Sequence, residues 1–293
     1  MSEVPTPAPE LTVACVQTNS ARDVAANLET VPPLVRAARD AGAALIVLPE
    51  NVSMMEPDTA LWREKALPEE GHPALAAFRA LARETGAWLL IGSLAIRVAG
   101  DKVANRSMLL DNEGRIVARY DKIHLFDVDL DGGESYRESA TIAPGDRAVV
   151  AATPWGRLGM SVCYDLRFAH LYRSLAKGGA DFLSIPAAFT RTTGRAHWHV
   201  LQRARAIETG CYVFAPAQCG VHAMGRETFG HALIVDPWGV VLADAGEGVG
   251  FIIATVSRAA VAEARRKIPA LTHDRPYAEP GLEPGLAADR FGR

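Results

Sequence analysis

The sequence predicts a layered α/β protein, with helices on the outside and β-sheets inside. Short apolar runs rich in β-branched residues alternate with alanine-rich stretches of helical periodicity, and this alternation occurs twice along the 293 residues. No linker or low-complexity segment separates the two halves. We therefore expect a single domain over residues 1–293, with a core at about 10–278 and loose ends that bury little apolar surface.

Each apolar or periodic run predicts one element. Strands are expected at residues 11–17, 44–50, 87–98, 104–114, 115–122, 156–165, 181–189, 211–219 and 250–256, with a hairpin at 231–246. Helices are expected from about Asn27 to Ala41, where Pro32 and Pro33 would disturb the first turns, and at 73–86, 168–179 and 195–210. The basic residues at 265–267 fit the C-terminal end of a further helix, where cations interact favourably with the helix dipole.

The composition excludes several classes of protein. Hydrophobic residues make up 49% and charged residues 22% of the chain, which is the balance of a globular domain. A net charge of −3 indicates neither a nucleic-acid-binding nor a membrane-binding surface, and no apolar run approaches the roughly 20 residues of a membrane-spanning helix. The first ten residues lack the pattern of a secretory signal, and the four cysteines lack paired spacing. We therefore expect a cytoplasmic protein without nucleic-acid or membrane partners.

Three reactive side chains follow predicted strands. Glu50 comes after the run ALIVLP, Lys122 after RIVARYD and Cys163 after GRLGMSV. Reactive groups of α/β proteins tend to lie where strands run out into loops. Taken alone, each residue has an ordinary interpretation: a solvated loop carboxylate, half of a surface ion pair, and an inert buried thiol.

Together, these three groups supply what attack on an amide carbon requires. A thiolate is the nucleophile. A carboxylate can accept the thiol proton and later donate it to the leaving group. An ammonium group, with a backbone N–H beside the cysteine, can stabilise the oxyanion. The sequence therefore predicts thiol-dependent hydrolysis of an amide-like bond.

Several segments resemble the nitrilase, or carbon–nitrogen hydrolase, superfamily over about residues 10–278. They are LPEN, YDKIHLFDVDLDG, SVCYDLRF, AAFTRTTGRAHWHVLQRARAIETGCYVFAPAQCG and GHALIVDPWG. The resemblance implies a four-layer α-β-β-α sandwich that pairs across its helices into a homodimer, with a higher homo-oligomer as the alternative. It also implies a catalytic triad of Glu50, Lys122 and Cys163, a further catalytic Glu138 in preference to Glu134, and the N–H of Tyr164 as an oxyanion donor.

Within the superfamily, the chain is similar to the branch that contains deaminated-glutathione amidase and omega-amidase, through HLFDVDL, TTGRAHW and APAQCG. This resemblance implies hydrolysis of a terminal carboxamide of a small carboxylate-bearing metabolite to acid and ammonia, through a thioester and without a cofactor. Deaminated glutathione is the expected substrate, and 2-oxoglutaramate or 2-oxosuccinamate, a nitrile and an N-carbamoyl compound are the alternatives. His199 stands where relatives more often carry glutamate, which leaves the substrate preference open.

Further residues near the cysteine are expected to bind the substrate. These candidates are Tyr164, Phe189, Thr190, Arg191 and Arg195. The two arginines could meet an acidic substrate, because a guanidinium group suits bidentate binding of a carboxylate. Asp165 and Arg167 could also bind a substrate carboxylate, but pairing with each other or with neighbouring loops is the favoured interpretation.

Residues 127–138 offer an alternative of another class, a calcium-binding loop. The segment DVDLDGGESYRE fits the pattern D-x-D-x-D-G-x5-E, with Asp127, Asp129 and Asp131 as ligands and Glu138 at the bidentate position. Such a loop lies between two helices, whereas the run before it predicts a strand and Pro144 interrupts the segment after it. Glu138 cannot easily serve both as a calcium ligand and as a catalytic acid, so the two interpretations compete.

Zinc and serine-hydrolase sites have less support. His197 and His199 are two residues apart on a predicted helix, so they do not share a face. Cys211 and Cys219 have no C-x-x-C partners, and the sequence has no G-x-S-x-G motif. We therefore expect no metal centre.

Overall fold

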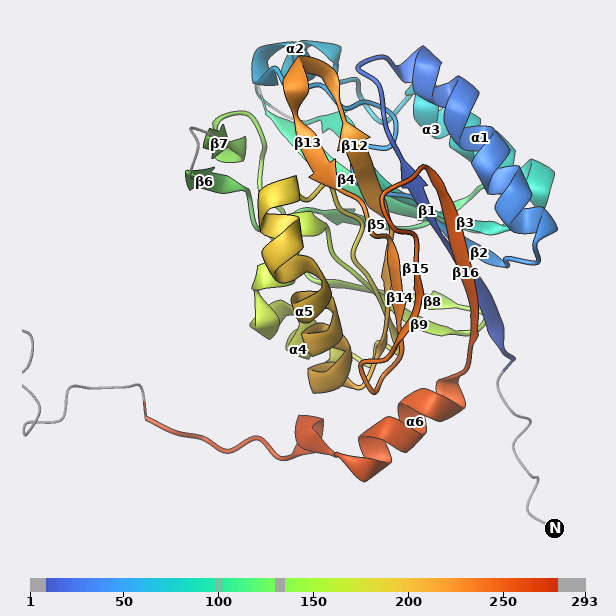
Figure 1. Ribbon diagram of the computed structural model, residues 1–293, viewed down its shortest axis with the longest axis vertical. Coiled ribbons are helices and arrows are strands. Elements are labelled where there is room, and N and C mark those ends of the chain that lie inside the picture. The colour runs from blue at the N-terminus through green and yellow to red at the C-terminus, as the bar shows by residue number, and fades with distance from the viewer. Residues whose placement is uncertain (1–8, 99, 101, 130–134, 279–293) are drawn as a thin grey trace, which may run out of the picture.

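Two β-sheets lie face to face in the structure, a computed structural model that describes residues 9–98, 100, 102–129 and 135–278 (Figure 1). In order across the larger sheet, the strands are β13 (Glu227–Phe229), β12 (Ala217–Val221), β1 (Leu11–Thr18), β2 (Leu45–Val47), β3 (Trp88–Arg97), β4 (Val103–Leu110) and β5 (Ile116–Asp121), and β16 (Gly250–Val256) pairs with β1. The smaller sheet has the order β15 (Val241–Asp244), β14 (Leu233–Val235), β11 (Tyr212–Ala215), β10 (Phe182–Ser184), β9 (Gly156–Met160) and β8 (Val149–Thr153). A separate hairpin consists of β6 (Asp127–Asp129) and β7 (Ser135–Arg137).

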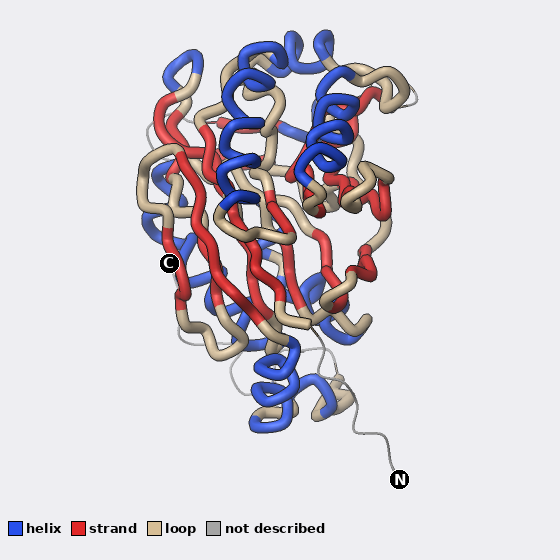
Figure 2. Tube along the Cα trace, turned by 90° about the vertical axis from the view of Figure 1, so that its right-hand side faces the viewer, coloured by secondary structure: helices blue, strands red, loops and turns tan. Residues whose placement is uncertain are grey.

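Helices cover the outer faces of both sheets (Figures 1 and 2). The helices are α1 (Val24–Asp40) and α3 (Pro73–Thr85) against the larger sheet, α4 (Ala169–Lys177) and α5 (Arg191–Thr209) against the smaller sheet, and α2 (Thr59–Lys65) and α6 (Arg258–Lys267) at the periphery. Short 3-10 turns are η1 (Glu138–Ala140), η2 (Cys163–Arg167), η3 (Ala223–Gly225) and η4 (Ala270–Thr272). The basic residues at 265–267 form the last turn of α6, as predicted.

The alternation of side chains along β1 explains the four layers. Successive residues of a strand point to opposite faces of the sheet. Val13 and Cys15 pack in the core that includes the smaller sheet, whereas Ala14 and Val16 pack with side chains of α1 and α3 such as Val35. Both faces of this strand are therefore buried, and the prediction of a four-layer α-β-β-α sandwich is confirmed.

Several element boundaries differ from the predictions: for example, β10 ends at Ser184 and not at 189, and α5 begins at Arg191 and not at 195. α1 begins at Val24, so Pro32 and Pro33 lie inside the helix and not in its first turns. The apolar run at 211–219 forms two strands in different sheets, because the chain crosses between the sheets at Pro216, which has no N–H for a ladder. The strand expected at 156–165 ends at Met160, and the chain then turns into η2.

Two further predictions were loose ends of the chain and the lack of a membrane-spanning helix. The loose ends predicted at either side of 10–278 fall on residues 1–8 and 279–293, which lie outside the described residues. Within the described part of the chain, each helix is too short or too polar to cross a membrane.

Candidate active site

Three loops from the two sheets bring Glu50, Lys122 and Cys163 together. Glu50 lies three residues beyond β2, Lys122 directly follows β5, and Cys163 begins η2 after β9. All three side chains are buried: relative exposure is 2% for Glu50, 1% for Lys122 and 8% for Cys163. The strands thus hold the three groups on rigid elements from both layers of the sandwich.

The Lys122 ammonium group lies between two carboxylates. Its Nζ donates to Glu50 Oε1 at 3.1 Å and to both oxygens of Glu138, at 3.0 and 2.8 Å. Glu138 also accepts a hydrogen bond from the backbone N–H of Phe126 at 2.8 Å. Since a buried charge is costly without a partner, this chain of ion pairs fixes the position of the lysine.

Glu50 is oriented by groups that the sequence did not single out. Asn105 Nδ2 donates to Glu50 Oε1 at 2.9 Å, and the backbone N–H of Ala188 donates to Glu50 Oε2 at 2.9 Å. Gln218 Nε2 donates to the backbone carbonyl of Glu50 at 2.9 Å. Asn105 lies within a predicted strand and gave no sequence signal of its own, because only the fold brings β4 beside Glu50.

Cys163 occupies an uncommon backbone conformation. Its φ of 51° is in the left-handed region, which non-glycine residues rarely adopt, and its N–H donates to the carbonyl of Pro186 at 2.9 Å. Strained residues of this kind persist where surrounding contacts hold them, often at active sites. Tyr164 is the second residue of η2, a position whose N–H has no acceptor within the turn.

Asp165 holds the cysteine turn to the lysine loop. Its fully buried carboxylate accepts hydrogen bonds from Val162 N at 2.8 Å, Tyr120 Oη at 2.6 Å, and His124 N and Nδ1 at 3.0 and 2.7 Å. Tyr120 and His124 flank Lys122, and Val162 precedes Cys163. Asp165 therefore has the structural role that the sequence favoured, although its partners do not include Arg167.

We expect Asp165→Asn to lower the free energy of unfolding by about 3 kcal/mol, because the new amide group would face two donors whichever way it is oriented. The loss of alignment should also lower kcat more than it raises KM. We would measure kcat and KM by steady-state kinetics at a temperature at which the variant is folded. Asp181→Asn is the matched control: Asp181 is also buried but precedes β10, at the other end of that strand from the site. Equal kcat loss in both variants would contradict a positioning role for Asp165.

The electrostatics favour a neutral thiol beside an ionised carboxylate. Burial and the neighbouring Glu50 raise the pKa of the Cys163 thiol well above its ordinary value. Burial opposes ionisation of Glu50, but Lys122 and hydrogen bonds outweigh it and hold the pKa of Glu50 below its ordinary value. Burial alone would lower the pKa of Lys122, yet Glu138 and Glu50 raise it. The site therefore holds an ionised Glu50 carboxylate beside a protonated Cys163 thiol.

The reactive groups line a small inner pocket that adjoins a larger outer cavity. The inner pocket is lined by Glu50, Lys122, Glu138 and Cys163 together with Tyr164, Phe189 and Thr190. The outer cavity has a volume of about 660 Å³ and is lined in part by Arg191 and Arg195. Phe126, Glu138 and Arg226 line both. The structure thus places each residue predicted for catalysis or substrate binding in one of two connected spaces.

Two arginines also line the inner pocket: Arg167, for which the sequence favoured a pairing role over substrate binding, and Arg226, which the sequence did not single out. The Arg167 guanidinium group lies 5.8 and 5.3 Å from the ring centroids of Tyr164 and Phe189, and it forms a 3.2 Å contact with His197 Nδ1. Arg226 lies over the ring of Tyr136 at 5.4 Å. Burial raises the pKa of Glu50, and the charge of Arg226 adds a smaller opposing effect to those of Lys122 and the Cys163 hydrogen bond. No sequence motif surrounds Arg226, which reaches the site only because β12 and β13 form a hairpin.

The segment at 127–138 does not have the structure of a calcium loop. The segment itself contains the antiparallel hairpin β6–β7, and the element before it is the strand β5, whereas a calcium loop lies between two helices. Asp129 forms an ion pair with Arg137 at 2.8 Å, and Glu138 faces Lys122. Asp131 and Glu134 lie outside the described residues. The structure therefore lacks the helix–loop–helix arrangement of a calcium loop, as the predicted strand before the segment indicated, and Glu138 belongs to the lysine site.

The residues considered for zinc and set aside in the sequence analysis do not form one site. His197 contacts Arg167, whereas His199 points to Asp244. Cys211 and Cys219 are buried, and all four cysteines are free thiols. His199 is nonetheless part of a second cluster, described below.

Comparison with known proteins decides the family. The carbon–nitrogen hydrolase model matches residues 12–266. The chain belongs to the carbon–nitrogen hydrolase family. This carbon–nitrogen hydrolase is 42% identical over 265 residues to the deaminated glutathione amidase of Synechocystis sp., covering 89% of the chain and 96% of the relative. It is 41% identical over 269 residues to the deaminated glutathione amidase of Homo sapiens, covering 90% and 82% of the two chains.

A solved structure supports the same assignment. The carbon–nitrogen hydrolase resembles Saccharomyces cerevisiae Nit3, a member of branch 10 of the nitrilase superfamily, with a TM-score of 0.83 and 29% identity over 92% of this chain and 98% of that one. The predicted family is therefore confirmed, and the chain is an enzyme of the class that acts on carbon–nitrogen bonds.

Proposed function

We propose that this enzyme is a cysteine-dependent amidase whose substrate is deaminated glutathione. The observation that carries the proposal is the Glu50–Lys122–Cys163 arrangement in a chain that is 42% identical to a deaminated glutathione amidase over 89% of its length. Omega-amidase activity and hydrolysis of a nitrile or an N-carbamoyl compound are outcomes of the test given below.

The proposed mechanism assigns one role to each group. Glu50 accepts the proton of Cys163, and the thiolate attacks the amide carbon. Lys122 and the N–H of Tyr164 stabilise the oxyanion. Glu50 then donates its proton to the leaving amine, and an activated water hydrolyses the thioester. Glu138 keeps Lys122 in place and borders the space for the substrate amide.

The leaving group depends on the substrate. A terminal carboxamide would release ammonia. Glutathione is a tripeptide whose units are joined by secondary amides, so its deaminated form has no terminal carboxamide. It would release a peptide amine in place of the ammonia that the sequence resemblance implied. Deaminated glutathione also has a carboxylate at each end. Arginines at the inner pocket and in the outer cavity offer partners for both carboxylates.

The direct test is an activity panel. We expect wild-type enzyme to release a new primary amine from deaminated glutathione, measured with an amine-reactive fluorophore. 2-oxoglutaramate, an N-carbamoyl amino acid and a simple nitrile, assayed for ammonia, should react with a kcat/KM at least about tenfold lower. A chelator should leave the rate unchanged. Preference for any of the other compounds would assign the enzyme to that reaction, and inactivity toward all four would refute the proposed substrate class.

The two arginines at the start of α5 should affect substrate binding more than turnover. We expect Arg191→Gln with Arg195→Gln to raise KM for deaminated glutathione about five- to tenfold, with little change in kcat, because each exposed or half-exposed ion pair contributes up to about 1 kcal/mol. Fewer cations at the first turn suit the helix dipole, and loss of the 3.0 Å surface ion pair between Arg191 and Glu227 should lower the free energy of unfolding by less than about 1 kcal/mol. Arg203→Gln, later on α5 and bonded to the Gly239 carbonyl, is the control. An unchanged KM in the double variant would remove these arginines from the binding site.

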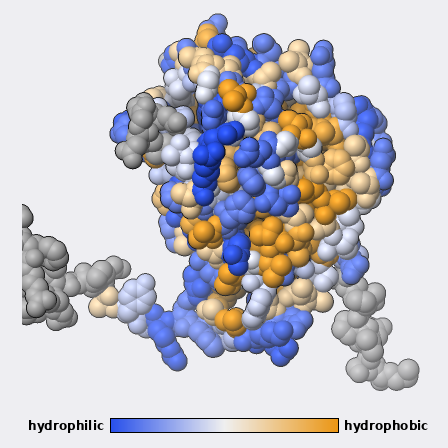
Figure 3. All heavy atoms as spheres, in the orientation of Figure 1, coloured by the Kyte–Doolittle hydropathy of each residue, from blue (hydrophilic) through white to orange (hydrophobic). Residues whose placement is uncertain are grey.

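We also propose that the enzyme is a cytoplasmic homodimer. Free cysteines suit a reducing compartment. Val200 and Ile207 on α5 are exposed, as are Trp238 and Val240 near β15, and Figure 3 shows apolar surface over the β15 and β16 side. We expect light scattering after size exclusion to give twice the chain mass for wild type and a monomer mass for Ile207→Glu. A monomeric wild type would contradict the dimer.

A further inference from the structure

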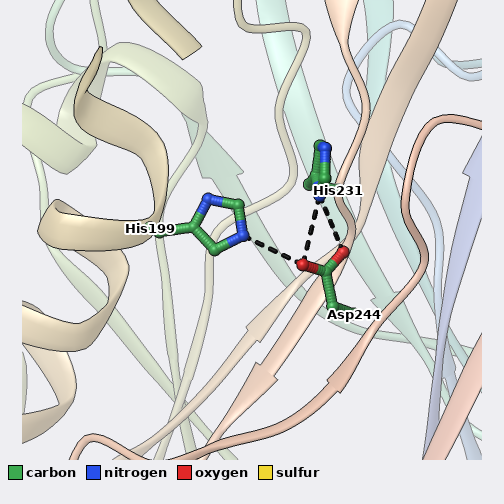
Figure 4. Close-up of side chains that lie close together, drawn as sticks. All are labelled: His199, His231 and Asp244. Atoms are coloured by element: carbon green, nitrogen blue, oxygen red, sulfur yellow. Dashed lines mark hydrogen bonds and ion pairs between the residues drawn. The ribbon is translucent and has the colours of Figure 1, made fainter. Parts of the chain in front are cut away.

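A His–Asp–His cluster lies outside the two pockets of the active site. His199 comes from α5, His231 from the turn between β13 and β14, and Asp244 from the end of β15 (Figure 4). His199 Nε2 lies 2.9 Å from Asp244 Oδ2, and His231 Nδ1 lies 2.9 and 3.1 Å from the two carboxylate oxygens. None of the three residues lines the inner pocket or the outer cavity. The proposed mechanism does not use this cluster.

The spacing of the donor atoms matches a small metal site. The three ligand atoms, one from each residue, all lie within 4.8 Å of one another. Around a tetrahedral ion bound at about 2.0–2.1 Å, neighbouring ligand atoms are about 3.4 Å apart. The two nitrogen–oxygen distances are already close to this value. Because all three side chains are partly exposed, they can adjust by rotation about their side-chain bonds.

The backbone holds two of the three residues in place. His231 has a φ of 55°, its N–H donates to the carbonyl of Gly246 at 2.7 Å, and its carbonyl accepts from Trp198 Nε1 at 2.7 Å. Asp244 Oδ1 accepts the N–H of Gly246 at 2.8 Å. Such outer hydrogen bonds orient ligands at known metal sites. The cluster is therefore built before any ion binds.

The donor set selects the kind of ion. Two imidazole nitrogens and one carboxylate oxygen suit Zn²⁺ and its neighbours among the transition metals, whereas Ca²⁺ and Mg²⁺ prefer oxygen ligands. To bind an ion, each imidazole would carry its proton on the other ring nitrogen. Within the described residues, His199 Nδ1 and His231 Nε2 have no hydrogen-bond partner in the protein. Both side chains are partly exposed, so these two nitrogens can form hydrogen bonds with water.

We propose that His199, His231 and Asp244 form a binding site for a divalent transition metal of the zinc type, with solvent completing a tetrahedral shell. A bound ion would join α5 to β15 and to the β13–β14 turn. The start of α5 lines the outer cavity, so the ion would brace the helix that carries Arg191 and Arg195. This site is independent of the proposed function, because it shares no residue with the active site.

The test uses zinc chloride with the full chain. We expect isothermal titration to show one Zn²⁺ per chain for wild type, and His199→Gln and His231→Asn to weaken binding at least about tenfold. Asparagine tolerates a positive φ, and its amide can donate to Asp244 as the imidazole does. His273→Gln, which removes an exposed histidine elsewhere, is the control and should bind as wild type does. Zn²⁺ should also raise the Tm of wild type and not of the two variants.

Two results would overturn the proposal. The first is wild-type binding no tighter than that of His231→Asn. The second is binding that survives in both cluster variants but disappears in Cys163→Ala, which would place the ion at the catalytic thiol. A third test uses the wild-type protein alone, with Co²⁺ as the bound ion. We expect an absorption spectrum typical of tetrahedral Co²⁺ without a thiolate charge-transfer band, and a thiolate band would refute the assignment.

Discussion

Cys163→Ala will lower kcat by at least about 10⁴-fold, because removal of a nucleophile leaves only binding and oxyanion stabilisation to accelerate the reaction. The chain should remain folded. Alanine replaces a small buried side chain at the same backbone conformation, so the free energy of unfolding should fall by only about 1 kcal/mol. Amine release from deaminated glutathione and a thermal denaturation curve measure the two effects.

Cys219→Ala is the matched control for the loss of a thiol. Cys219 is 2% exposed, lies on β12 and does not line the inner pocket. We expect this variant to keep the wild-type kcat. Activity of Cys163→Ala within tenfold of wild type would remove Cys163 from the mechanism, and equal losses in the two variants would indicate a general effect of packing.

Lys122→Met is the second variant with a large expected effect, and it should alter both activity and stability. Loss of an oxyanion donor should lower kcat about 10²- to 10³-fold. The substitution also leaves Glu50 and Glu138 without their shared cation, so the free energy of unfolding should fall by about 3–5 kcal/mol. Kinetics at low temperature and chemical denaturation separate the two effects.

The stability difference between wild type and Lys122→Met should depend on pH. In the wild type, burial opposes ionisation of Glu50, but Lys122 and hydrogen bonds outweigh this effect and lower the pKa of Glu50. The ion pair therefore stabilises the fold fully at pH values above the pKa of an ordinary carboxyl group. That contribution is lost as pH falls through the lowered pKa, and the difference in Tm should then narrow. Lys177→Met, which removes a surface ion pair with Asp274, is the control and should change stability by less than about 1 kcal/mol at either pH. A difference in Tm that is the same at neutral and acidic pH would contradict the proposed role of the ion pair.

The sequence predicted the reactive groups better than the groups that hold them. Glu50, Lys122 and Cys163 were recognisable because each follows an apolar run at a strand end. Asn105 was not, because a polar residue inside a strand has many possible partners until the neighbouring strands are known. Arg226 reaches the inner pocket only through the β12–β13 hairpin.

The limits of the fold prediction have a similar cause. Periodicity identifies an apolar run, but it does not show which sheet the run joins, and residues 211–219 therefore appeared as one strand although Pro216 divides them between two sheets. The end of β9 at Met160 was missed because Val162 and Cys163 continue the apolar run into the turn. The positive φ of Cys163 has no sequence signal, since cysteine is not a residue that favours this conformation.

The most direct measurement of the central claim is mass spectrometry of the wild-type enzyme mixed with excess deaminated glutathione and quenched in acid within milliseconds. The proposed mechanism predicts an acyl adduct on the peptide that contains Cys163, with a mass equal to that of the substrate minus the released amine. The adduct should form no more slowly than the amine is released, and it should be absent from Cys163→Ala. An adduct on another residue, or steady amine release with no adduct at any time, would contradict a thioester mechanism at Cys163.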